Sequence, residues 1–463
     1  MSGLDGVFEY VKKNLDNYVD KELSQLISYK TVAHYKETKD DFTRAANDIK
    51  LWLEKAGIEE VQLISDFGNP IIYGNKFVDK DLPTVVMYAH YDVQPAEPFD
   101  LWKTDPYKLT VENGRMYARG VADDKTLLLS IIKALEAMND NDVELKYNVK
   151  ILFEPSEEAG SDELNSMFDK TKNASFELHR ELLSNATMIA CDTSMLNENK
   201  PSINIGVRGC VHFELTVHGA NRDIHSGSYG GLVGNPIHEL SRLIATIHDE
   251  NNHITIDGFY DDVNTTDEKR QMSNNIPFDV DFIKNDLGIK NIVYEKQFTP
   301  RQSCRLRPTV EVNGIYGGHI KDGNKTIIPS KATAKFSIRM VDNQDPSKIM
   351  CLFEKHINKN IDDAYSYELH DVDKGCSAVT TDINCPDFRN VKEAMREEYG
   401  EEPLLIRGGG SLPIVSKMQE VLKCNVVFLG FGGATSNSHG PNENYSLNSF
   451  ERGIRTIIRF LSK

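Results

Sequence analysis

The chain has 463 residues, of which 40% are hydrophobic and 27% charged, a composition typical of a folded protein of two or three domains. Its formal net charge of −17 disfavours binding to nucleic acid or to an anionic membrane. It has no run of the ~18–20 apolar residues that a membrane span needs, and residues 1–13 lack an apolar signal-peptide core. The seven cysteines are an odd number without a C-x-x-C pair, so we expect a reducing, cytoplasmic location.

The first 190 residues alternate helical and strand patterns, as in an α/β domain with a largely parallel sheet. Apolar residues at helical spacing predict a helix over 40–55 that ends at Gly57. Residues 112–114 have the composition of a hairpin turn, and 124–138 have a helical pattern. Short apolar runs predict buried central strands at 84–89, 149–153 and 187–190.

Near Gly206 the pattern changes to the alternation of half-exposed antiparallel strands, at 202–207, 211–217 and 332–340. Further helices are predicted at 235–248 and 347–359. The first pattern returns with a helix that begins near Pro386, a buried strand and a last helix, at 425–429 and 450–461. We interpret the chain as one α/β domain split by an inserted α+β domain, with boundaries 1–206, 207–384 and 385–463.

Acidic and imidazole side chains follow the predicted buried strands. His90 and Asp92 close the first strand, and residues two apart in extended chain share a face. Because open α/β sheets bind ligands at the carboxyl ends of their strands, we expect such side chains to gather at one edge. The others are Asp123, Asp124, Glu157, Glu158, Asp192 and His439.

The alternative for each of these groups is structural. Asp92 could cap the chain beside a core His90, and acidic pairs are usually exposed to solvent, as we expect for Glu59–Glu60. Glu157 and Glu158 directly follow an apolar run, where gathered carboxylates need a counter-charge. Two divalent cations ~3.5–4 Å apart can share one carboxylate and activate a bridging water. The mixed nitrogen and oxygen ligands favour Zn²⁺, Mn²⁺ or Co²⁺.

Six segments together resemble the M20 metallopeptidase family, within it the branch of cytosolic nonspecific dipeptidases and carnosinases. They are His90–Pro95, Arg119–Lys125, Glu157–Glu158, His225–Gly227 with Gly230–Gly231, Phe336–Val341 and Arg407–Pro413. The resemblance implies an α/β fold, in which helices sandwich a mixed, mostly parallel sheet and the insertion is a ferredoxin-like lid and dimerisation domain. It also implies two divalent metal ions per subunit, Zn²⁺ or Mn²⁺.

The resemblance assigns roles to the residues at the strand ends. Asp123 is the implied bridging ligand and Glu157 the general acid and base. Asp92 is implied to orient the imidazole of His90 without touching a metal. The remaining implied ligands are His90 and Asp192 for one metal, and Glu158 and His439 for the other.

The resemblance also implies a homodimer in which the inserted domain completes the site of its partner. His225 and Thr326 would contact substrate in the other subunit. Arg339 would pair with the free carboxylate of the substrate, a contact that suits a planar guanidinium, and Ser411 would make a further contact. The glycine-rich segment 407–411 could instead bind phosphate, but it lacks the Gly-Lys-Ser/Thr that follows in nucleotide-binding loops.

These features predict a metal-dependent dipeptidase that cleaves substrates such as Cys-Gly, carnosine-like or nonspecific dipeptides. In this family, Asp at the position of Asp192 accompanies dipeptidases, whereas Glu is typical of deacylases. The alternative is an M20-type N-acyl-amino-acid deacylase with the same metal centre. A catalytically silent binding protein is a third hypothesis, which the complete set of ligands disfavours.

Overall fold

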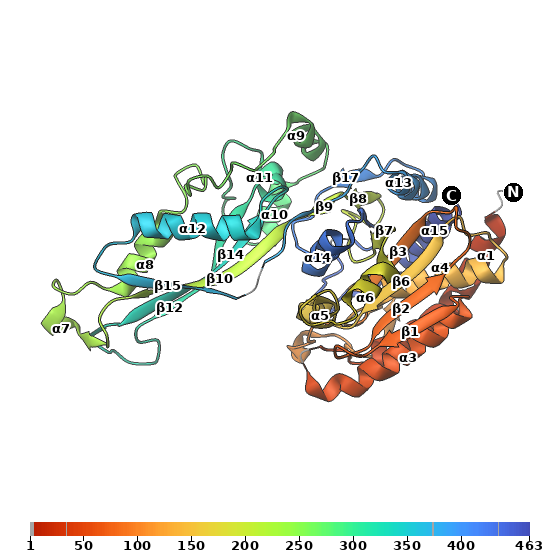
Figure 1. Ribbon diagram of the computed structural model, residues 1–463, viewed down its shortest axis with the longest axis horizontal. Helices are drawn as coiled ribbons and strands as arrows, with labels where there is room; N and C mark the ends of the chain where they lie inside the picture. The colour runs from red at the N-terminus through yellow and green to blue at the C-terminus, as the bar shows by residue number, and fades with distance from the viewer. Residues whose placement is uncertain (1–3, 34, 373–374, 434) are drawn as a thin grey trace. The chain divides into compact units, whose positions relative to one another are not determined.

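A computed structural model describes residues 4–33, 35–372, 375–433 and 435–463 (Figure 1). The chain forms two compact units. The first contains the chain up to Ile205, Thr381–Ile406 and the chain from Lys417 onward; the second contains Gly206–Thr380 and Arg407–Ser416. Among the described residues, no helix is long and apolar enough to cross a membrane.

A six-stranded mixed sheet forms the centre of the first unit, in the order β1-β2-β6-β3-β7-β18 (Figure 1). The bounds are β1 Glu60–Ile64, β2 Ile71–Lys76, β6 Asn148–Glu154, β3 Thr84–His90, β7 Thr187–Ala190 and β18 Val426–Phe428. The pairs from β6 to β18 are parallel, and the pairs of β2 with β1 and β6 are antiparallel. The structure therefore confirms the predicted buried strands and a mixed α/β fold.

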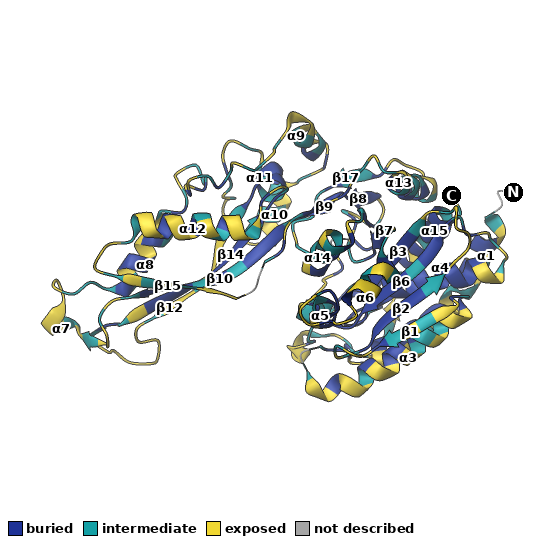
Figure 2. Cartoon of the chain, in the orientation of Figure 1, coloured by how far each residue is buried: buried dark blue, intermediate teal, exposed yellow. Residues whose placement is uncertain are grey.

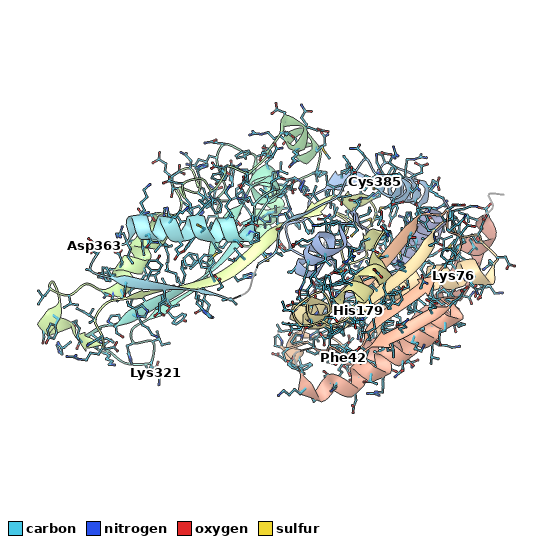
Figure 3. All side chains as sticks on the ribbon, in the orientation of Figure 1. Phe42, Lys76, His179, Lys321, Asp363 and Cys385 are labelled. Carbon is cyan, nitrogen blue, oxygen red and sulfur yellow. The ribbon has the colours of Figure 1, made fainter. Side chains whose placement is uncertain are left out.

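The helices of this unit include those predicted from apolar spacing. Phe42, labelled in Figure 3, lies on α3 (Lys39–Lys55) and is buried. Its ring meets that of Tyr91 edge to face, with centroids 5.8 Å apart. His179 on α6 is also buried, and its Nδ1 lies 2.8 Å from Nδ2 of Asn173. The α-helices are α1 Asp5–Asn17, α2 Ser24–Ser28, α3 Lys39–Lys55, α4 Lys125–Asp140, α5 Asp162–Met167, α6 Phe176–Leu183, α13 Pro386–Tyr399 and α15 Leu447–Leu461. A π-helix spans Tyr18–Leu23, and 3₁₀ turns span Lys36–Thr38, Phe99–Leu101 and Glu157–Ala159.

Two smaller sheets complete the first unit. The predicted hairpin forms as β4 Thr110–Glu112 and β5 Arg115–Tyr117, and β19 Asn444–Ser446 joins its other edge. β8 Ser202–Asn204 pairs in parallel with β17 Leu404–Ile406. β17 and β19 therefore pair with strands that come much earlier in the sequence.

The second unit is built on a four-stranded antiparallel sheet, in the order β12-β14-β10-β15. β10 alternates buried and half-exposed residues over most of its length, as Figure 2 shows. Its buried face includes Phe213, which stacks on Phe336 and meets Phe353 of α12 edge to face. The strands are β10 Gly209–His218, β12 Thr309–Gly317, β14 Lys331–Met340 and β15 Ser366–Asp371.

The remaining elements of this unit are short strands and helices. α8 and α12 confirm the two helices predicted here. The strand pairs are β11 Ile224–His225 with β13 Ile327–Ile328, and β9 Gly206–Val207 with β16 Val379–Thr380. The helices are α7 Ser226–Tyr229, α8 Pro236–Ala245, α9 Asp267–Asn274, α10 Val280–Asp286, α11 Pro300–Leu306 and α12 Pro346–Asn360. α14 Pro413–Leu422 carries the chain from the second unit to the first.

Two details differ from the sequence interpretation. The predicted antiparallel strand 202–207 is two strands with different partners: β8 pairs in parallel with β17, and only β9 pairs antiparallel, with β16. Arg407–Ser416, which we placed in the segment 385–463 of the α/β domain, belongs to the second compact unit. Contacts within that unit hold it: Arg407 pairs with Asp342, and the Gly408 N–H donates to the Gly206 carbonyl at 2.9 Å.

Candidate active site

The first unit places seven of the predicted site residues at or near the ends of its elements. Since β6, β3 and β7 are adjacent and parallel, the segments that follow them leave the same edge of the sheet (Figure 1). His90 ends β3, Asp192 follows β7, and Asp123 precedes α4. Glu157 and Glu158 form the 3₁₀ turn after β6, Asp92 follows β3, and His439 precedes β19.

Asp123 faces two imidazoles, one with each carboxylate oxygen. Its Oδ1 lies 3.0 Å from Nε2 of His90, and its Oδ2 lies 3.0 Å from Nε2 of His439. The same nitrogen of His439 lies 3.1 Å from Oε1 of Glu158. A carboxylate between two nitrogen ligands is the arrangement needed to bridge two cations.

Potential ligand atoms converge in two overlapping groups that share His90. One atom each from His90, Asp123 and Glu158 lie within 4.8 Å of one another. One atom each from His90, Glu157 and Asp192 do the same. The structure thus brings together all the residues that sequence analysis assigned to metal binding and to acid–base chemistry.

Charge interactions in this cluster shift several ionisations. Burial raises the pKa of Asp192 to about 7, and raises that of Glu157 well above its ordinary value with help from the Asp192 charge. Hydrogen bonds to Asp123 and Glu158 raise the pKa of His439 to about 10. Burial alone would raise the pKa of Asp123, but hydrogen bonds from His439 and His90 lower it. The cluster holds more negative charge than its imidazoles neutralise.

Asp92 contacts both His90 and the 3₁₀ turn that contains Glu157 and Glu158. This fully buried carboxylate lies 3.2 Å from Nδ1 of His90 and accepts the backbone N–H groups of Glu157 and Glu158, at 3.1 and 3.0 Å. A proton on Nδ1 shared with Asp92 would leave the Nε2 lone pair available to a metal ion beside Asp123. The geometry therefore suits Asp92 for orienting His90.

Glu443 is a buried site residue that the sequence interpretation missed. It pairs with Arg119, with 2.6 Å between Oε2 and Nη1, and accepts the backbone N–H groups of Gly120, Ala122 and Asp123. Its carboxylate thus holds the loop that presents Asp123. A signal was present, since Arg119 is a charged residue between the hairpin and a buried helix and needs a counter-charge.

The donor set fits divalent cations. Oδ2 of Asp192 is buried and has no hydrogen-bond partner, and an uncompensated carboxylate oxygen of this kind is costly unless a cation accompanies it. A cavity of about 420 Å³ opens beside this group, lined among others by Asp123, Asp192, Gly432 and Asn437. Two imidazoles with carboxylates and no thiolate match Zn²⁺ or Mn²⁺.

The other four predicted residues lie in the second unit as two pairs. Nη1 of Arg339, on β14, donates to Oγ of Ser411 at 2.7 Å. His225 and Thr326 are exposed on neighbouring segments, where the Ser226 N–H donates to the Thr326 carbonyl at 3.1 Å. Nδ1 of His225 accepts the Gly227 N–H at 2.9 Å, which leaves Nε2 as the donor of a neutral imidazole.

These two pairs do not meet within one chain. Thr326 lies before the start of β14, whereas Arg339 lies near its end. Arg339 comes eight positions after Lys331 in the extended strand, a span of about 26 Å at ~3.3 Å per residue. One dipeptide therefore cannot contact both pairs of the same subunit.

The chain is similar to known proteins over most of its length. Residues 86–463 match the model of peptidase family M20/M25/M40. The chain is 30% identical over 477 residues to Cys-Gly metallodipeptidase dug1 of Schizosaccharomyces pombe, covering 99% of this chain and 98% of that protein. It is 29% identical to Beta-Ala-His dipeptidase of Homo sapiens, covering 84% and 76%. The structure of the di-peptidase Dug1p from Saccharomyces cerevisiae aligns with a TM-score of 0.81 and 28% identity, covering 100% and 98%. The chain therefore belongs to peptidase family M20/M25/M40.

Proposed function

We propose that this protein is a metal-dependent dipeptidase. The observation that carries the proposal is Asp123, whose two oxygens face His90 and His439, with Glu157, Glu158 and Asp192 beside them. Similarity to a Cys-Gly dipeptidase and to a Beta-Ala-His dipeptidase over most of the chain supports dipeptides as substrates. The same similarity gives no support to the alternative, an N-acyl-amino-acid deacylase.

The proposal includes two divalent ions, Zn²⁺ or Mn²⁺, per subunit. Asp123 would bridge them, with His90 and Asp192 on one ion and Glu158 and His439 on the other. When bound, the ions lower the pKa of the attacking water and polarise the scissile carbonyl. A cytoplasmic location also remains part of the proposal.

Side chains of the protein carry out the proton transfers and hold the ligands in position. Glu157 takes a proton from the attacking water and returns it to the leaving amine. Its burial favours the protonated state that this second step requires. Asp92 keeps the imidazole of His90 in one orientation, and Glu443 keeps the Asp123 loop in place.

The substrate contacts come from the second unit, which we propose to be a lid and dimerisation domain. Arg339 binds the free carboxylate of the dipeptide, and its hydrogen bond to Ser411 fixes the guanidinium plane. His225 donates from Nε2 to the developing oxyanion in the partner subunit, beside Thr326. The separation of the two pairs along β14 supports a site shared between two subunits.

Hydrolysis assays on chelator-treated protein test this proposal. The protein is refilled with Mn²⁺ or Zn²⁺ and given Cys-Gly, β-alanyl-His, other dipeptides and N-acetyl amino acids. We expect metal-dependent cleavage of dipeptides only. Cleavage of the acetylated compounds alone would establish a deacylase, and a metal content near zero after refilling would favour a silent binding protein.

The role of Arg339 has a separate test. Lysine keeps the charge but cannot form the two-point contact, so Arg339→Lys should raise KM for dipeptides about tenfold or more, with a smaller change in kcat. Arg301→Lys, on α11 of the same unit, is the control. An unchanged KM in Arg339→Lys would remove Arg339 from substrate binding.

A further inference from the structure

Two cysteines of the second unit lie side by side in an antiparallel bridge. The Cys210 N–H donates to the Cys376 carbonyl at 3.0 Å, and the Cys376 N–H donates back to the Cys210 carbonyl at 2.8 Å. Their sulfur atoms are 3.6 Å apart. No other cysteine pair among the described residues has its sulfurs in contact.

Glycines bring the two backbones this close. A side chain at Gly209 would lie 2.4 Å from the Cys376 carbonyl oxygen. Gly375 has φ of +68°, and a side chain there would lie 2.8 Å from the Cys210 carbonyl oxygen. A pair that exchanges both backbone hydrogen bonds has its Cα atoms about 5.5 Å apart, within the ~4.4–6.8 Å that a disulfide spans. Closing the 3.6 Å gap between the sulfur atoms to a disulfide therefore needs side-chain rotation and a small backbone adjustment, but no change of register.

Cys210 has the low pKa of a reactive thiol. Its hydrogen bond with Cys376 lowers its pKa; burial opposes this, and the Ser411 hydroxyl and Arg339 charge lower the pKa further, to about 6. The thiolate is the form that attacks oxidants. Although both cysteines are buried, at 5% and 8% exposure, hydrogen peroxide is close to water in size.

The pair is next to the residues that we assign to substrate binding. Cys210 is directly opposite Arg339 in the register of β10 and β14. Ser411 also lowers the pKa of this thiol, and its hydroxyl accepts a hydrogen bond from the Arg339 guanidinium. A sulfur bonded to Cys376 would no longer be a thiol that can interact with Ser411.

We propose that Cys210 and Cys376 form a reversible disulfide on exposure to peroxide, and that this bond weakens dipeptide binding through Ser411 and Arg339. The Cys210 thiolate attacks one peroxide oxygen, the O–O bond breaks, and a sulfenic acid and water form once the leaving oxygen is protonated. The Cys376 sulfur then displaces the hydroxyl as a second water. Two thiols lose two electrons and two protons to one peroxide. Cys210 acts here as a positioning residue, and the effect on binding rests on the proposed function.

The experiment treats the full-length, metal-loaded protein with increasing hydrogen peroxide, blocks the remaining thiols and maps the peptides without reduction. We expect a Cys210–Cys376 linked peptide, together with a rise of about tenfold in KM, the effect of ~1.4 kcal/mol, at nearly constant kcat. Dithiothreitol should reverse both changes. Cys376→Ser should keep the basal activity and show neither change, whereas a variant at the exposed thiol, Cys351→Ser, should behave as wild type.

Two results would overturn the inference. Absence of the linked peptide at peroxide levels that oxidise Cys351 would refute the disulfide, and a linked protein with unchanged KM would refute the coupling to substrate binding. The peptide map does not depend on catalysis. A reduced, metal-loaded wild type without dipeptidase activity would therefore count against the proposed function, whereas a fully active enzyme that never forms the link would count against this inference.

Discussion

The two units hold their site residues in different ways. In the first unit, His90 and Asp92 are buried and Asp192 is half-buried, and the hydrogen bonds that orient the His90 imidazole come from Asp92 and Asp123 of the same unit. In the second unit, His225 and Thr326 are exposed, and the His225 imidazole is held by the Gly227 N–H of its own turn. The comparison teaches that the candidate metal-binding cluster is preorganised within one chain, whereas in our proposal the exposed pair becomes part of a site only together with a partner subunit.

The largest expected effect comes from Glu157 in the preorganised cluster. Glu157→Gln removes the proton carrier but keeps the size of the side chain, so kcat should fall about 10³-fold. Metal content should stay at the wild-type level, because Glu157 is not assigned as a ligand. Steady-state kinetics with elemental analysis measure both quantities, and Glu181→Gln, at an exposed position of α6, is the control. A variant with more than a tenth of wild-type kcat would exclude Glu157 as the general base.

A variant of Glu443 tests how far the stability of the first unit depends on the buried ion pair of Glu443 with Arg119. Glu443→Gln leaves the Arg119 charge buried without its partner, so the free energy of unfolding should fall by about 3–5 kcal/mol. Denaturant unfolding of the metal-free protein measures it. Glu393→Gln breaks an exposed Glu–Arg pair and should leave the unfolding midpoint unchanged. Equal effects of the two variants would contradict the special position of Glu443.

His225 tests whether the second unit acts across subunits. His225→Ala should lower kcat about 10²-fold, as loss of an oxyanion donor does. Mixing it with Glu157→Gln, under conditions that exchange subunits, gives heterodimers with one intact site each. Random association should restore about a quarter of wild-type activity, since half of the dimers are mixed and each has one of two sites intact. Mixtures that remain as inactive as their components would show that His225 serves its own subunit or none.

The smallest effect concerns Glu154, which lies in β6 beside the cluster. Burial raises its pKa to about 8, so the folded protein keeps a proton that the unfolded chain releases near its ordinary value. The preference of the folded protein for protonated Glu154 stabilises it fully at low pH, and this stabilisation is lost as the pH rises toward 8. Between pH 5 and 8, metal-free wild type should lose about 2–4 kcal/mol more stability than Glu154→Gln. Parallel pH profiles of the two proteins would contradict the shifted ionisation.

Local patterns were sufficient to predict the central strands and the meeting of the candidate ligands that follow them. β3, β6 and β7 are short apolar runs with polar residues at their ends, and a parallel sheet necessarily brings those ends to one edge. Glu443 could not be found in this way, because its partners in the 119–123 loop are more than 300 residues earlier in the sequence. The exchange of Arg407–Ser416 between units was missed for a related reason, since its ion pair with Asp342 joins distant segments.

The contact between Asp123 and His439 also limits when the enzyme can mature. These residues are 316 positions apart in the sequence. During synthesis, a nascent chain with His90, Asp123 and Glu158 already folded still lacks the second imidazole and the Glu443 support of the loop until residues 439–443 have been made. We therefore expect stable metal loading only once that later segment has joined the first unit.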